Sequence, residues 1–505
     1  MPHILLPLAL SFVTFQQIAF LVDCYKQSKD REETQRLKSN IENNAESQKP
    51  ILDSSKTESF KEIPHINFLD YCLFITFFPQ LIAGPIVHHK EMMPQFYAMS
   101  RGDSKICDKD LESKQLVGDS KILELESGLC ESTQGRALSV RNRSGDGAIA
   151  DSSPKAESLH IINWEYIAKG LFIFSIGLFK KVVIADSFAK WANAGFSAVE
   201  SGSILNLFES WATSLSYTFQ LYFDFSGYCD MAIGLGLLFG IVLPINFNSP
   251  YKALNIATFW RKWHITLGRF LKEYLYIPLG GNQNLAYKQS RFYVALNNLL
   301  TLRNLFIVAF LSGVWHGAGW GFVIWGSLHG LAMVVHRIYM LLYKRLDSKV
   351  KDCACSDKAG RLDFKSLYIR FMKSRIYAVL CWILTFNFVN IAWVFFRAEN
   401  MQGAVNLLNG MFGGDIVLPS FLESRLGFLS EYGIQFQWWL EQIQGSFITY
   451  LCIIGAFIVC LGFRNGVEQV THFKPTKFNL FIIALFSLIA FLSIDKARQF
   501  LYFNF

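Results

Sequence analysis

The stretch that decides the fold covers residues 292–343 and reads FYVALNNLLTLRNLFIVAFLSGVWHGAGWGFVIWGSLHGLAMVVHRIYMLLY. It is apolar almost throughout, and a helix needs about 20 mainly apolar residues to cross a bilayer. The stretch is therefore long enough for two membrane helices. Its middle, residues 312–320, is rich in glycine and contains His316. We predict that the two helices are joined by a turn at this point.

Basic residues flank this stretch on both sides. Residues 251–303 contain a single acid, Glu273, against eight basic residues at 252, 261, 262, 269, 272, 288, 291 and 303. After the apolar stretch, basic residues return at 337, 344 and 345. Cytoplasmic loops of membrane proteins carry such an excess. Both ends of the helix pair are thus predicted to face the cytoplasm, with His264 close to it and His316 deeper in the membrane.

Other parts of the chain are also long and apolar enough to span a membrane. They cover residues 4–22, 68–87, 166–185, 203–223, 229–244, 377–396, 447–464 and 477–494. The first has no basic leader and no small-residue cleavage signal, so we expect a retained helix and not a signal peptide. The predicted fold class is all-α, a polytopic transmembrane helical bundle with re-entrant and interfacial helices, formed by one domain over residues 1–505.

The composition agrees with lipid as the main solvent. Of the 505 residues, 52% are hydrophobic and 17% are charged, against about 25% charged in soluble proteins. The net charge of +8 is concentrated beside apolar spans, which indicates cytoplasmic flanks and not a nucleic-acid partner. The ten cysteines are scattered, a pattern that favours neither a disulfide framework nor a zinc or other metal site.

Two polar segments interrupt the apolar pattern, at residues 25–62 and 97–160. Both are rich in charged and small residues and have no sustained apolar period. Segments of this kind cannot bury enough apolar surface to order themselves. We predict that both are disordered loop inserts.

His316 is the first candidate for chemistry. An ionisable residue at membrane depth is costly and is a functional candidate by default. Trp315 precedes it, and Gly317 and Gly319 would permit a tight turn and close approach of a substrate. The structural alternative is a histidine that forms hydrogen bonds between helices.

A second motif, residues 259–282, begins FWRKWHITL and ends YLYIPLGGN. Aromatic and basic residues alternate at its start, which is typical of a helix at the membrane interface. Proline and glycines at 278, 280 and 281 predict a re-entrant loop, which needs shelter from lipid. The candidate site residues are Trp260, Arg261, His264 and Asn282; the alternative is an ordinary interfacial anchor.

The third motif, QLYFDFSGYCD at residues 220–230, places two carboxylates among apolar residues. Asp224 and Asp230 must point into a cavity or find a partner. Both a substrate contact through Asp224 and a structural role, tying broken helices together, remain open at this point.

Taken together, these motifs resemble the alginate O-acetyltransferase branch of the membrane-bound O-acyltransferase (MBOAT) family. The residues that carry the resemblance are FPQLIAGPI at 78–86, the runs 222–234 and 259–282, WHG at 315–317, AWVFFRAE at 392–399 and FLYF at 500–503. They occur in family order from about residue 4 to the last residue. Family members usually have further helices before the segment that matches residues 1–23, so we expect this chain to lack them.

The resemblance implies that His316 is the histidine characteristic of the superfamily and that His264 is the second functional histidine of this branch. It also implies acetyl-CoA as the acyl donor from the cytoplasmic side, with no bound cofactor. The acceptor would be an exported polysaccharide such as an alginate-like polymer, or peptidoglycan, or a periplasmic protein that carries acetyl groups. The expected location is the bacterial inner membrane, crossed several times.

Acetyl transfer from a thioester to a hydroxyl needs a base and stabilisation of the oxyanion. Histidine titrates near neutrality, so His316 is the expected base, and His264 would position a substrate or protonate the leaving thiolate. Substrate contacts are expected from Asp224, Arg261, Trp260, Asn282 and Trp315. Direct transfer is favoured, and an acyl-enzyme on Ser312 stays open. The competing class is a transporter or channel, against which the lack of an internal repeat argues.

Overall fold

A computed structural model describes residues 10–43, 68–80, 84–101, 163–282, 292–354 and 364–494, together with Leu501. The helices before the decisive stretch are α1 (Leu10–Asn43), α2 (Phe68–Thr76), α3 (His89–Arg101), α6 (Trp164–Phe179), α7 (Asp186–Glu200), α8 (Leu207–Leu238), α9 (Ile256–Lys262) and α10 (Ile265–Leu271). The later helices are α11 (Tyr293–His316), α12 (Trp320–Ala354), α13 (Phe364–Met372), α14 (Arg375–Arg397), α15 (Met401–Gly413), α16 (Glu423–Leu426), α17 (Phe447–Gly462), α18 (Gly466–Thr471) and α19 (Lys477–Leu492). Strands β1 (Val417–Pro419) and β2 (Gln435–Gln437) form one small parallel pair.

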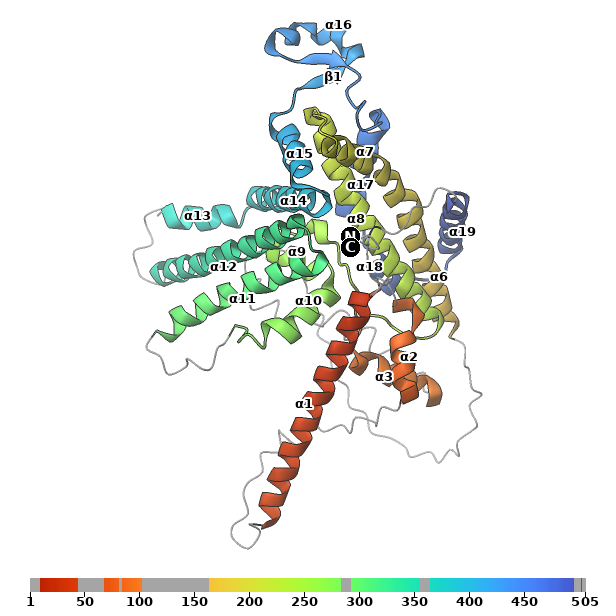
Figure 1. The fold of residues 1–505 in the computed structure, drawn as a ribbon, viewed down its shortest axis with the longest axis vertical. Coiled ribbons are helices and arrows are strands. Elements are labelled where there is room, and N and C mark those ends of the chain that lie inside the picture. The colour runs from red at the N-terminus through yellow and green to blue at the C-terminus, as the bar shows by residue number, and fades with distance from the viewer. Residues whose placement is uncertain are drawn as a thin grey trace, which may run out of the picture.

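The helices form two groups on either side of the central helix α8 (Figure 1). On one side α8 packs against α6 and α7, and α19 lies against α6. On the other side α11 packs against α12, α12 against α14, and α14 returns to α8. The short helices α9 and α10 lie between the two groups, and β1 with α16 forms a small cap at one end of the molecule. The all-α fold predicted from the sequence is confirmed.

The predicted helix pair in residues 292–343 is confirmed as α11 and α12, joined at residues 317–319. Small residues let the two helices approach closely. A Cβ added to Gly313 would lie 2.7 Å from the Cα of Gly326 on the facing helix. Such contacts between small residues are how membrane helices pack when lipid removes the hydrophobic driving force. The close contact between Gly313 and Gly326 therefore helps to hold the end of α11, which carries His316, against α12.

Glycine is also required where α12 meets α14. A Cβ on Gly321 would collide with the carbonyl oxygen of Phe395, and backbone atoms cannot yield as a flexible side chain can. We expect Gly321→Ala to destabilise the protein by about 1–3 kcal/mol, the usual cost of overpacking, measured as a lower apparent Tm in detergent. Gly319→Ala is the matched control, because its Cβ would meet nothing closer than 3.7 Å. Equal stability of both variants would contradict this prediction.

The prediction of separate spans at 203–223 and 229–244 was wrong, because α8 continues unbroken from Leu207 to Leu238. Two of its carboxylates pair inside the protein with lysines of the π-helical segment Lys180–Ala185. Lys180 Nζ lies 2.6 Å from the Asp230 carboxylate, and Lys181 Nζ lies 2.9 Å from the Asp224 carboxylate. Asp224 and Asp230 therefore do not interrupt the helix, because each forms an ion pair within the bundle.

Three further corrections concern segments near the N-terminus. Residues 68–87 are not one span, since α2 ends at Thr76 and the chain continues through a short 3-10 turn at Phe78–Gln80; the prolines at 79 and 85 supply no helix hydrogen bond. Residues 25–43, predicted as disordered, continue α1, because Lys, Glu, Gln and Arg are good helix formers. Residues 97–101 close α3. The rest of both polar inserts lies outside the described residues.

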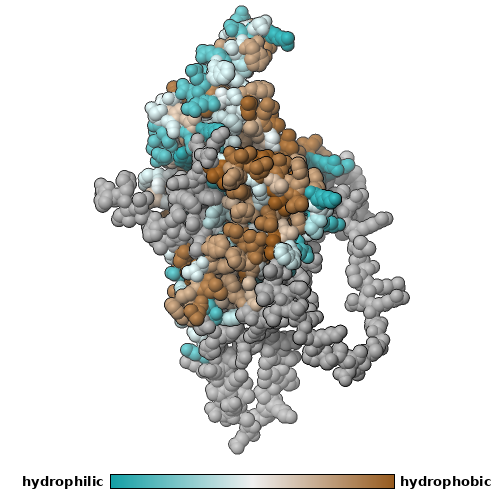
Figure 2. Space-filling view, turned by 90° about the vertical axis from the view of Figure 1, so that its right-hand side faces the viewer, coloured by the Kyte–Doolittle hydropathy of each residue, from teal (hydrophilic) through white to brown (hydrophobic). Residues whose placement is uncertain are grey.

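The surface of the bundle is apolar around its middle. Figure 2 shows a broad hydrophobic band on the face that includes α19, with hydrophilic residues above it. Phe478, Phe481 and Leu488 on α19 are all more than half exposed, which in a water-soluble protein would mark an interaction surface. Within the described residues, α11, α12 and α14 are long and apolar enough to cross a membrane. An exposed apolar band of this kind is what a surface in contact with lipid requires.

Candidate active site

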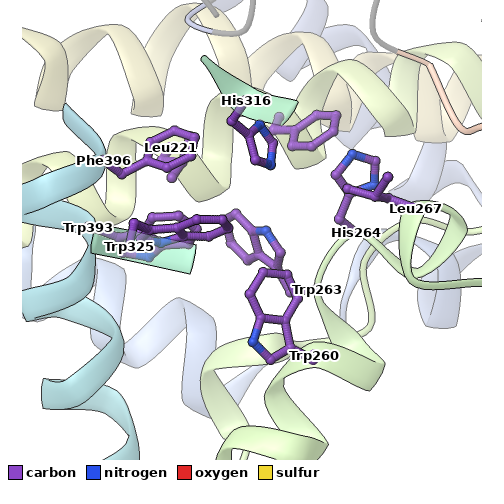
Figure 3. Close-up of a pocket in the computed structure, with 10 residues that line it drawn as sticks. Leu221, Trp260, Trp263, His264, Leu267, His316, Trp325, Trp393 and Phe396 are labelled. Carbon is purple, nitrogen blue, oxygen red and sulfur yellow. The ribbon is translucent and has the colours of Figure 1, made fainter. Parts of the chain in front are cut away.

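A narrow cavity lies where α8, α9, α10, α11, α12 and α14 converge. Its walls are Leu221, Phe225, Trp260, Trp263, His264, Leu267, His316, Trp325, Trp393 and Phe396. Figure 3 shows the rings of His264 and His316 projecting into the same space, with tryptophans below them. About 20 Å³ is open to the centre of a water molecule, which is room for roughly one water. The two histidines are the ionisable groups of an otherwise apolar lining.

His264 lies in the tight turn between α9 and α10. Its backbone angles, φ 47° and ψ 53°, are left-handed, a conformation that few residues other than glycine adopt. Residue 246, an asparagine in the loop after α8, holds the turn from both backbone and side chain. Its carbonyl accepts the Ile265 N–H at 3.0 Å, and its Oδ1 lies 3.0 Å from Nδ1 of His264. The Phe225 ring meets the imidazole edge-on at 4.9 Å.

His316 is the last residue of α11. Aromatic rings enclose it: Trp325 at 5.4 Å and Phe396 at 5.1 Å, both edge-on, and its neighbour Trp315 at 4.7 Å between ring centroids. The next residue, Gly317, has no room for a side chain because the Phe322 ring occupies the space where a Cβ would stand. The imidazole is thus held at the start of the turn by packing on several sides.

The two histidines lie at the same end of α11. Segment Lys272–Tyr276 and the loop after it run back along that helix, with Asn297 Nδ2 donating to the Asn282 carbonyl at 2.7 Å and Asn304 Nδ2 to the Leu279 carbonyl at 3.0 Å. The difference in membrane depth between the two histidines, which the basic residues predict, stays a prediction.

The structure brings only some of the predicted substrate-binding residues to the cavity. Trp260 lines it, and its indole N–H donates to Nδ1 of the fully buried His329 at 3.2 Å. Trp315 is not part of the lining; it stacks on Phe15 at 4.8 Å and backs His316. Trp260 thus contacts the cavity directly, whereas Trp315 supports its wall.

The other three predicted substrate-binding residues lie outside the cavity lining: Asp224, Arg261 and Asn282. Asp224 is 2% exposed and accepts hydrogen bonds from Lys181 and from the backbone N–H of Leu501 at 2.9 Å. Arg261 is exposed, with Nη2 3.3 Å from the Thr258 hydroxyl. Asn282 is exposed, and its Oδ1 accepts the Tyr276 hydroxyl at 2.6 Å. Of the two roles left open for Asp224, the geometry favours the structural one.

Sequence reasoning missed most of the cavity wall. Trp263 and the pair Trp393 and Phe396 lie within motifs already recognised, but nothing singled them out as cavity residues. Trp325 stacks on Trp393 at 5.5 Å and lies on α12, the helix that follows the turn after His316. Its presence in the apolar run after the turn was the available signal.

The arrangement suits proton transfer in a dry environment. Walls of aromatic side chains leave room for about one water, and so apolar an enclosure strengthens electrostatic interactions at the two imidazoles. Within the described part of the chain, no serine or cysteine lines the cavity, so the lining offers no hydroxyl or thiol nucleophile, and Ser312 is buried outside it. Among the described residues, no three histidine, cysteine or acidic side chains gather as metal ligands would.

Comparison with known proteins places this site in a family. A model of the membrane-bound O-acyltransferase family, MBOAT, matches residues 1–102 and 160–354. The chain belongs to this family. It is therefore an acyltransferase of the membrane, and the family resemblance found in the sequence is confirmed. Both cavity histidines lie within the matched residues.

Individual relatives agree with this assignment. The chain is 41% identical over 511 residues to a peptidoglycan O-acetyltransferase of Helicobacter pylori, covering all of this chain and 75% of that protein. It is 30% identical over 410 residues to a probable alginate O-acetylase AlgI of Pseudomonas aeruginosa, covering 81% of this chain and 52% of that protein. A teichoic acid D-alanyltransferase of Bacillus subtilis is 27% identical over 173 residues, 34% of this chain and 41% of that protein.

Proposed function

We propose that this MBOAT protein transfers an acetyl group from acetyl-CoA to hydroxyls of an exported cell-envelope glycan. The observation that carries the proposal is the convergence of His264 and His316 on one apolar cavity. Relatives named for O-acetylation of peptidoglycan and of alginate support this acceptor class. Peptidoglycan is the acceptor that fits best, because the relative of that name matches the whole chain at 41% identity.

In the proposed reaction the acceptor hydroxyl attacks the thioester carbonyl directly. Nε2 or Nδ1 of His316 takes the hydroxyl proton as the new C–O bond forms. The tetrahedral intermediate then collapses, the C–S bond breaks, and the proton on His316 passes to the leaving thiolate. His264 assists from the opposite wall of the cavity.

The pattern of basic residues supports the proposed donor and the proposed location. Arg261 and Lys262 stand at the end of α9, and their positive charges would attract the phosphates of the donor on the cytoplasmic side of the bacterial inner membrane. The acetyl group then leaves on the other side, either directly to the glycan or through a periplasmic carrier protein. Because the activated thioester is inside the cell and the acceptor is outside it, the acetyl group has to pass across the membrane.

Binding of acetyl-CoA separates this proposal from a transporter. Purified protein in detergent is expected to bind radiolabelled acetyl-CoA in a saturable manner, and unlabelled coenzyme A should displace the label. Deletion of the gene is expected to lower ester-linked acetate in the envelope glycans, measured by mass spectrometry, and re-expression should restore it. Unchanged glycan acetylation after deletion, or no saturable binding of the thioester, would refute the proposed function.

A further inference from the structure

Asn246 lies behind His264, outside the cavity lining, and is 1% exposed. Its side-chain oxygen Oδ1 is within hydrogen-bond distance of three groups: His264 Nδ1 at 3.0 Å, Thr266 Oγ1 at 2.9 Å and the Thr266 backbone nitrogen at 3.2 Å. Its amide nitrogen Nδ2 donates to the thiol sulfur of Cys229 at 3.4 Å. The amide is thus engaged at both ends.

The backbone of Thr266 decides which way this amide points. A backbone N–H can only donate, so the atom facing it must be the oxygen. The Thr266 hydroxyl is compatible with this orientation, because it can donate to Oδ1 at 2.9 Å while its oxygen accepts the Ile86 N–H at 3.0 Å. The contact with the Thr266 N–H therefore decides which end of the Asn246 amide is the oxygen and which is the nitrogen.

The amide orientation in turn fixes the tautomer of His264. An oxygen at 3.0 Å from Nδ1 requires Nδ1 to carry a hydrogen, and in a neutral imidazole the other nitrogen, Nε2, then holds a lone pair. The ring projects into the space that it shares with His316 (Figure 3). Neutral His264 thus presents a hydrogen-bond acceptor to the cavity.

We infer that Asn246 is a positioning residue that keeps His264 as an acceptor, so that His264 binds a hydrogen-bond donor of the substrate and does not protonate the leaving thiolate. The inference rests on the proposed function only where it mentions a substrate; the tautomer of His264 does not depend on that function. Of the two roles that the sequence left open for His264, positioning fits the tautomer and proton donation does not. The thiolate then receives the proton that His316 took from the hydroxyl.

The tautomer itself can be measured without any reaction. Protein labelled with ¹³C and ¹⁵N histidine in lipid nanodiscs gives ring chemical shifts that distinguish the Nδ1–H from the Nε2–H tautomer, and loss of a signal in His264→Gln identifies the His264 resonance. We expect the Nδ1–H form in the natural protein and a shift toward Nε2–H in Asn246→Leu. An Nε2–H form in the natural protein, or an unchanged tautomer in Asn246→Leu, would overturn the inference, whether or not the proposed function holds.

Activity gives a second readout. Asn246→Leu removes the acceptor oxygen at similar volume and is expected to lower kcat roughly 10- to 100-fold, the size of the loss when a metal-bound histidine loses the partner that orients it. Asn246→Asp keeps the oxygen and should retain several-fold more activity than Asn246→Leu. Cys229→Ala, which removes only the partner of Nδ2, should remain near the natural rate. Equal losses in Asn246→Asp and Asn246→Leu would show that packing, and not the acceptor, is what matters.

Discussion

Replacing His316 with alanine is expected to reduce ester-linked acetate in the envelope glycans to the level of a strain that lacks the gene. General base catalysis by a positioned side chain contributes about 10²- to 10⁴-fold to a rate, and the methyl group of alanine cannot accept the hydroxyl proton. The measurement is glycan acetate released by mild base, normalised to the amount of protein in the membrane fraction. Insertion and yield should be unchanged, because the aromatic walls around residue 316 remain.

The control for this experiment is His472→Ala. His472 follows α18 and takes no part in the cavity lining, so this variant removes an imidazole without touching the site. Its glycan acetate should equal that of the natural protein. Near-normal transfer by His316→Ala at equal protein levels would remove His316 from the mechanism and leave the cavity as a binding site only.

Replacing Asp224 with alanine is expected to have the largest effect on stability. The change leaves the ammonium group of Lys181, whose side chain is 4% exposed, with Asp186 as its remaining carboxylate at 2.7 Å. Removing the sole partner of a buried charge costs about 3–5 kcal/mol. Because Lys181 keeps Asp186, the expected loss lies toward the lower end of that range, and it includes the cost of leaving the buried Leu501 N–H without its acceptor. We expect a much lower yield of folded protein and a lower apparent Tm in detergent. Molecules that do fold should keep their activity, since Asp224 lies outside the cavity.

An exposed ion pair provides the comparison. Glu91 pairs with Arg269 with side chains 41% and 28% exposed, and exposed pairs contribute only about 0–1 kcal/mol. Glu91→Ala should therefore leave the apparent Tm almost unchanged. If Asp224→Ala instead raised KM for the donor or the acceptor at unchanged stability, the carboxylate would belong to substrate binding, as the sequence alone allowed.

The sequence by itself determined the features that depend on local pattern. The apolar stretch at residues 292–343 with a glycine-rich centre predicted two helices and their turn, because both the length of a span and the position of a turn are local properties. The Trp-His motifs identified the family and both histidines for the same reason. The continuation of α1 beyond residue 25 was missed because a helix built on propensity alone leaves no apolar period to detect.

Only the tertiary structure decided which groups meet. Asp224 could be assigned only once Lys181 was seen beside it, since an ion pair between two helices leaves no mark in the spacing of either one. The cavity wall likewise joins Trp263, Trp325 and Trp393 from three separate parts of the chain. Asn246 had no signal at all, because its role depends on a loop lying against the turn at His264. Long-range contacts set these pairings, and a helical period specifies which face of a helix is apolar but not what that face will touch.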